Sequence, residues 1–121
     1  DHLHTIWTLP GGDANYARRW AEIKSAFSRR WLRLGGDEEQ ISNKQWKDRR
    51  RGVWQRRYFE HTIRDENDFQ AHLDYIHFNP VKHGWVKQVT DWPYSSLHRY
   101  VKQGILPPDW AGYEKEGKFG E

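Results

Sequence analysis

The feature that most constrains this chain is a stripe of large apolar residues between positions 16 and 34. Its members recur at steps of four, three, four, four and three residues, and they are Tyr16, Trp20, Ile23, Phe27, Trp31 and Leu34. This spacing follows the 3.6-residue period of an α-helix, so we predict one long amphipathic helix here. Asp13 can cap its start, and Gly35-Gly36 can end it.

Two other segments have the composition of strands. The run from His2 to Leu9 and the run from Val53 to Ile63 are rich in β-branched, aromatic and aliphatic side chains. Residues 37–52, between the long helix and the second run, show no periodicity and are expected to form a flexible surface loop.

A second helix is predicted to begin after Asp65, which can serve as its N-cap. It should end near Asn79, because the residue before a proline disfavours helical backbone and Pro80 follows. A short helix through Val101 should come after the turn at 91–96, with a loosely structured tail from residue 107. These elements predict an α+β fold with at least two strands and three helices.

Composition narrows the class of protein. The 121 residues are enough for a single domain, and 8 Trp, 6 Tyr and 5 Phe can supply an aromatic core. The absence of Cys excludes disulfides and thiolate metal sites. No stretch has the length of a membrane span, so a cytoplasmic protein without a membrane partner is expected. The net charge of +3 and pI near 9.2 favour anionic partners.

His2 and His4 are candidate metal ligands. On a strand, residues two apart share a face and are separated by about 6.6 Å. Two imidazoles at that spacing can bind one divalent cation. The alternative is a pair of solvated or hydrogen-bonded histidines.

Tyr75 is a candidate nucleophile. Asp68, His72, Tyr75 and Asn79 follow one another at steps of four, three and four, so they form one stripe on the second helix. A tyrosine that attacks phosphorus must lie near the cation that neutralises the phosphate, and the Asn79 amide oxygen could complete the shell of that cation. The alternative is that Tyr75 is an aromatic residue at the boundary of the core and that Asn79 only ends the helix before Pro80. His72 and His77 are expected at the surface.

A basic segment follows the predicted loop. Residues 44–57 contain seven basic side chains against one acidic residue, interleaved with Trp46 and Trp54. Cations beside aromatic faces suit single-stranded nucleic acid, whose phosphates and unpaired bases they can contact. The residues predicted to bind nucleic acid are Lys44, Lys47, Arg49, Arg50, Arg51, Trp54, Arg56 and Arg57. A solvated charge run is the alternative.

Three segments resemble the REP-associated tyrosine transposases, a bacterial group within the single-tyrosine HUH transposases. Residues 1–10, DHLHTIWTLP, are similar to the strand of the family in which a hydrophobic residue separates two histidines. Residues 53–86 contain YIHFNP, similar to the pattern that begins with the nucleophilic tyrosine, and residues 91–101, DWPYSSLHRYV, resemble the closing segment. With the helix from residue 14 to 34, the resemblance covers nearly the whole chain.

The resemblance implies Tyr75 as the nucleophile and His2, His4 and Asn79 as ligands of Mg²⁺ or Mn²⁺. It implies nicking and strand transfer of single-stranded DNA at palindromic hairpins through a 5′-phosphotyrosine intermediate. The sequence leaves open whether the protein is a monomer or a homodimer. The implied fold is a ferredoxin-like or RRM-like antiparallel sheet with helices packed on it. Because the family has a strand and a helix before the histidine strand, residues 1–121 are expected to be an N-terminally truncated single domain.

Two other functions remain open from the sequence. The chain could be a catalytically inactive module that binds DNA hairpins, or a structural domain whose histidines bind zinc or nothing. His72 is a candidate for helping Tyr75 to lose its proton, which must leave during attack because a free phenol has a pKa near 10.

Overall fold

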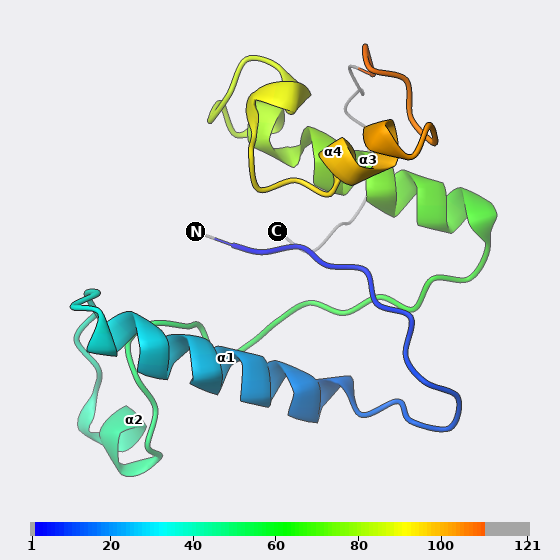
Figure 1. The fold of residues 1–121 in the computed structure, drawn as a ribbon. Coiled ribbons are helices and arrows are strands. Elements are labelled where there is room, and N and C mark those ends of the chain that lie inside the picture. The colour runs from blue at the N-terminus through cyan, green and yellow to red at the C-terminus, as the bar shows by residue number, and fades with distance from the viewer. Residues whose placement is uncertain (1, 111–121) are drawn as a thin grey trace. The chain divides into compact units, whose positions relative to one another are not determined.

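A computed structural model of the chain describes residues 2–110 (Figure 1). The predicted tail from residue 107 lies mostly outside this range. The elements are α1 (Tyr16–Arg33), α2 (Asn43–Lys47), α3 (Glu66–Lys82), the 3₁₀ helix η1 (Val89–Asp91) and α4 (Leu97–Lys102). They belong to two compact units. The α1 unit is Trp7–Tyr58, and the α3 unit joins the residues up to Ile6 with those from Phe59 onward.

The long helix α1 confirms the prediction from the aromatic stripe. Its N-cap is Asn15, whose side chain accepts a hydrogen bond from the Arg18 backbone N–H at 3.1 Å. Asp13, the predicted cap, lies two residues too early and accepts instead from the backbone N–H of Asn15 at 2.9 Å. The helix ends before Gly35, which has a positive φ of 81°.

The aromatic side chains of the α1 unit pack against one another. The Trp7 ring stacks on Trp20 with centroids 4.9 Å apart, and Trp54 meets Phe27 edge to face at 5.2 Å. Phe27 nevertheless remains 46% exposed. These contacts hold the segments that flank α1 against the helix while leaving much of the stripe accessible.

The segment predicted as a flexible loop, residues 37–52, contains a short helix, which corrects that prediction. α2 begins with a capping box, in which Ser42 Oγ accepts from the Gln45 backbone N–H at 3.2 Å and Gln45 Oε1 accepts from the Ser42 backbone N–H at 2.8 Å. Glu39 N–H donates to Gly52 O at 2.8 Å and closes the segment. A Cβ on Gly52 would lie 1.9 Å from the Glu39 carbonyl oxygen, so only glycine fits there.

The predicted strands, His2–Leu9 and Val53–Ile63, are wrong. Residues 2–110 contain no strand, and the antiparallel ferredoxin-like or RRM-like sheet is therefore not found in the described part of the chain. Side-chain composition favours extended backbone, but a strand also needs a partner whose backbone groups complete its hydrogen bonds. Neither segment makes a backbone ladder with another described segment.

Helix α3 begins where predicted and ends later. The Asp65 side chain accepts from the Asp68 backbone N–H at 2.9 Å, which confirms the N-cap. Pro80 lies inside the helix, so the predicted end at Asn79 is wrong. The helix stops at Gly84, which has a φ of 71°, with hydrogen bonds from Gly84 N–H to Val81 O and from Trp85 N–H to Pro80 O, both 2.9 Å. This pair of bonds forms a Schellman motif.

The core of the α3 unit forms around η1, which contacts both α3 and α4. Its buried hydrophobic residues are Leu73, Tyr75, Val89 and Leu97. His77, predicted at the surface, is only 1% exposed, and its Nε2 lies 2.9 Å from Ser96 Oγ. The prediction for His77 failed because its position on α3 faces α4, which the pattern of α3 alone does not reveal. The short helix α4 confirms the helix predicted after the turn.

Within the described residues, no helix is both long and apolar enough to cross a membrane.

Candidate active site

The two histidines near the N-terminus lie beside the stripe on α3. The ring centroids of His2 and His4 are 4.9 Å apart, and the His4 ring meets the Tyr75 ring edge to face at 5.5 Å. His2 Nε2 lies 3.2 Å from Asn79 Oδ1. The structure therefore brings together the four residues that the sequence selected, although 70 or more positions separate the histidines from the helix residues.

Local geometry explains this grouping. Tyr75 and Asn79 are four residues apart and so lie on one face of α3, where they are 6% and 8% exposed. His2 and His4 are two residues apart in a segment without regular secondary structure, and their ring centroids lie 4.9 Å apart, so the two side chains are on the same side. The two histidines are therefore neighbours, as predicted, although the strand that was expected to align them is not found in the described residues.

Lys82 and His83 also reach this site, and sequence reasoning missed both. Lys82 Nζ lies 5.0 Å from the centroid of the Tyr75 ring, and the His83 ring is 5.2 Å from that of His2. Both residues lie beyond the predicted end of the helix. Gly84 was the available signal, because a glycine after a helix commonly marks its C-terminus.

The donors present fit a divalent metal ion. His2 and His4 offer imidazole nitrogens and Asn79 an amide oxygen. The 3.2 Å between His2 Nε2 and Asn79 Oδ1 is close to the separation of neighbouring ligand atoms around such an ion, about 3 Å. No large rearrangement of His2 and Asn79 is needed for both to contact one cation.

His72 lies in a different group of side chains. Its Nδ1 is 2.8 Å from the Asp68 carbonyl oxygen, and 3.2 Å from the Asp68 carboxylate. Its side chain is 18% exposed, so it is partly buried and less exposed than predicted. One turn of helix separates it from Tyr75.

The predicted nucleic-acid-binding segment belongs to the α1 unit, so it is described separately from the histidine and tyrosine site. Within it, Arg51 forms a bidentate ion pair with Glu38, and Arg50 lies 3.3 Å from Asp48. Trp54 packs against Phe27 rather than standing free. The other predicted residues of the segment are exposed, and they are Lys44, Lys47, Arg49, Arg56 and Arg57.

The candidate site of the α3 unit therefore consists of a buried tyrosine on a helix, with two histidines and an asparagine beside it. Comparison with known proteins identifies relatives of the chain. The chain is 46% identical over 121 residues to the REP-associated tyrosine transposase of Escherichia coli. It is 51% identical over 112 residues to a protein of Haemophilus influenzae to which the same name is given provisionally. The similarity to REP-associated tyrosine transposases that the sequence motifs indicated is thus confirmed.

A solved structure leads to the same group. It shows a REP-associated tyrosine transposase bound to a REP hairpin, and it matches 95% of this chain with a TM-score of 0.75 and 44% sequence identity. The chain spans 62% and 63% of the two relatives, from H. influenzae and E. coli, and 59% of the chain in the solved structure. No family model matches the sequence.

Proposed function

We propose that this chain recognises REP-type DNA hairpins and cuts and rejoins single-stranded DNA through a covalent bond to Tyr75. The observation that carries the proposal is the convergence of His2, His4, Tyr75 and Asn79. The relatives support it, since two carry the name of tyrosine transposases and one was solved with a REP hairpin.

In the proposed reaction, the Tyr75 oxygen attacks the scissile phosphorus in line with the bond to the 3′ oxygen of the preceding nucleotide. A bond forms between the phenol oxygen and phosphorus, and the bond from phosphorus to the 3′ oxygen breaks. The phenol gives up one proton and the departing 3′ oxygen gains one, so the products are a 5′-phosphotyrosine and a free 3′-hydroxyl. Attack by another 3′-hydroxyl reverses these steps and rejoins strands without ATP.

His2, His4 and Asn79 would hold Mg²⁺ or Mn²⁺, which when bound supplies Lewis-acid stabilisation of charge on the phosphate. Tyr75 is held for attack by its burial on α3 and by the edge of the His4 ring. Lys82 places positive charge over the Tyr75 ring, where it favours the negative charge that develops as the proton leaves.

The test is an adduct assay with a hairpin oligonucleotide labelled at its 3′ end. With Mn²⁺, the label should remain with the protein on a denaturing gel, whereas a 5′ label should leave with the released strand. Tyr75→Phe should abolish the band. Tyr94→Phe is the matched control, because Tyr94 is 85% exposed and lies in the same unit. Equal adduct from wild type and Tyr75→Phe would remove Tyr75 from the mechanism.

A hairpin-binding module without cleavage is the second candidate, favoured by the hairpin in the solved relative. It predicts salt-sensitive retention of the hairpin with no adduct under any metal condition. Binding should then be unchanged in Tyr75→Phe. The same two measurements, adduct and retention, therefore separate the two functions.

A further inference from the structure

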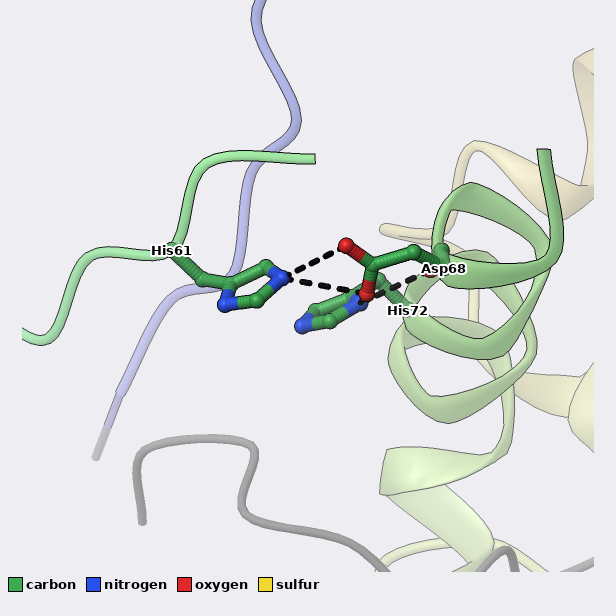
Figure 2. Close-up of side chains that lie close together, drawn as sticks. All are labelled: His61, Asp68 and His72. Atoms are coloured by element: carbon green, nitrogen blue, oxygen red, sulfur yellow. Dashed lines mark hydrogen bonds and ion pairs between the residues drawn. The ribbon is translucent and has the colours of Figure 1, made fainter. Parts of the chain in front are cut away.

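We propose that His61, Asp68 and His72 form a second metal site, which takes a divalent transition-metal ion such as Zn²⁺. This site is separate from the His2, His4 and Asn79 group and does not depend on the proposed transposase reaction. Each of its three residues can offer one ligand atom, and the three atoms lie within 4.8 Å of one another. Figure 2 shows the two imidazole rings facing the same carboxylate.

The distances match those around a small cation. His61 Nε2 lies 3.0 Å and 2.8 Å from the two oxygens of Asp68, and His72 Nδ1 lies 3.2 Å from Oδ1. Ligand atoms about 2.1 Å from a zinc ion are separated from each other by about 3.0 to 3.4 Å. A metal ion can therefore replace the hydrogen bonds between these side chains. Its entry also requires His72 Nδ1 to give up its hydrogen bond to the Asp68 carbonyl oxygen, and the two imidazole nitrogens, which lie within 4.8 Å of each other, to converge on the ion.

The fold places the three ligands before any metal binds. Asp68 and His72 are four residues apart on α3, and the Asp65 cap fixes the turn that carries Asp68. His61 comes from the segment that leads into the helix, and its ring stacks on that of His72 with centroids 4.4 Å apart and an angle of 13° between planes. The three side chains are thus gathered before metal binds, which reduces the cost of ordering them. Because the lone pair of an imidazole nitrogen lies in the plane of its ring, one ring must turn out of this stack for both nitrogens to bind the same ion.

The charges also suit a cation. Asp68 places a carboxylate between the two imidazoles, so an anionic oxygen donor lies beside two nitrogen donors. Its side chain is only 10% exposed. Arg64 is the competing positive charge, with Nε 3.4 Å from Asp68 Oδ2, but its side chain is 76% exposed and can move into solvent.

Two imidazoles and a carboxylate are a donor set that binds zinc and related transition metals. Bound metal would fasten the segment before α3 to the first two turns of the helix, one turn before Tyr75. The expected role is therefore to stabilise the helix that carries the tyrosine.

The test measures Zn²⁺ binding by calorimetry and Co²⁺ binding by visible absorption in the whole chain carrying His4→Ala, which disables the first group. This variant, in which His61, Asp68 and His72 are intact, should bind one equivalent of metal ion. Adding His61→Ala or His72→Gln should weaken binding at least about 100-fold. His98→Ala is the matched control, because His98 is an exposed histidine of the same unit, and it should change nothing.

Thermal unfolding provides a readout independent of stoichiometry. Zn²⁺ should raise the Tm of the His4→Ala chain, EDTA should reverse the rise, and neither effect should remain after His61→Ala. Circular dichroism shows whether each variant keeps its helices. Absence of Zn²⁺ and Co²⁺ binding in the folded His4→Ala chain would overturn the proposal, and so would unchanged affinity in folded His61→Ala and His72→Gln variants.

Discussion

Lys82 lies directly over the ring of Tyr75, with Nζ 5.0 Å from the ring centroid, because seven residues along α3 return to the same face after two turns. The contact exists only because the helix continues through Pro80. A proline in the last turn removes one hydrogen bond to the carbonyl four residues earlier, but Pro80 is buried and the Schellman motif at Gly84 completes the end of the helix.

Lys82→Gln should slow formation of the tyrosine adduct about twofold to thirtyfold, the range for losing about 0.5 to 2 kcal/mol of cation–π and charge stabilisation. Lys82→Arg should restore most of the rate, because it keeps the charge over the ring. The measurement is the adduct rate at saturating hairpin. Lys87→Gln, which removes an exposed lysine of the same unit, is the control, and a rate equal to that of Lys82→Gln would show that only net charge matters.

The same stretch shows which features of the site the sequence could predict. The periodicity of α3 and the spacing of His2 and His4 were enough to select four residues that the structure brings together. Lys82 and His83 were missed because a local rule about proline was given priority over the glycine four positions later. Pro80 is buried in the folded chain, and the helix continues through it to the glycine. That burial depends on tertiary packing, which a local sequence pattern does not show.

Gly84→Ala should destabilise the α3 unit by about 1 kcal/mol. Gly84 has a φ of 71°, and a Cβ there would meet nothing within 4 Å, so the cost is the backbone conformation alone. Gly84→Asn should cost less, since asparagine tolerates the left-handed region. Urea unfolding measures the difference. Gly11→Ala is the control, as Gly11 has no positive φ and also has open space, and it should be neutral.

His77 should make stability depend on pH. Burial is the main cause that lowers its pKa below the ordinary 6.5, while the charge of Asp74 opposes the shift. The unfolded chain therefore binds a proton at His77 more readily than the folded chain does. The contribution of neutral His77 to the free energy of unfolding is thus fully present above about pH 6.5 and is lost as the pH falls. The Tm should decline between about pH 7.5 and 5.5.

The variant His77→Gln should flatten that decline even if it lowers the Tm at every pH, since glutamine does not titrate. His98→Gln is the control, because His98 is exposed and hydrogen bonds to the Trp92 carbonyl. A slope in His77→Gln as steep as in wild type would assign the pH dependence to other groups.

The strands were the larger failure of the sequence analysis, and the reason is physical. Helices complete their hydrogen bonds within one segment, so the 3.6-residue period of α1 and α3 was sufficient to predict both. Strand formation depends on another segment, and the composition of His2–Leu9 carries no information about a partner. α2 was missed for a different reason, because the Ser42 and Gln45 capping box was present in the sequence but was not used.

The ion pair between Glu38 and Arg51 gives a prediction for DNA binding by the basic segment. The hydrogen bond from Arg51 is the main cause that lowers the pKa of Glu38, so the pair is charged at neutral pH and Arg51 is partly neutralised. Glu38→Gln frees this arginine for a phosphate. Because each phosphate contact on a single strand adds about 0.7 to the slope of log affinity against log salt, the slope should become steeper by about that amount.

Arg56→Gln should have the opposite effect, making the slope shallower by about 0.7, because Arg56 is exposed and offers its charge directly. Glu60→Gln changes the net charge of the chain as Glu38→Gln does, but Glu60 belongs to the α3 unit and Glu38 pairs with Arg51 of the basic segment, so Glu60→Gln should leave the slope nearly unchanged. Fluorescence anisotropy with a single-stranded oligonucleotide over a salt series measures all three variants. Equal slopes in wild type, Glu38→Gln and Arg56→Gln would mean that the basic segment is solvated in the complex, and that the nucleic acid is bound elsewhere on the chain.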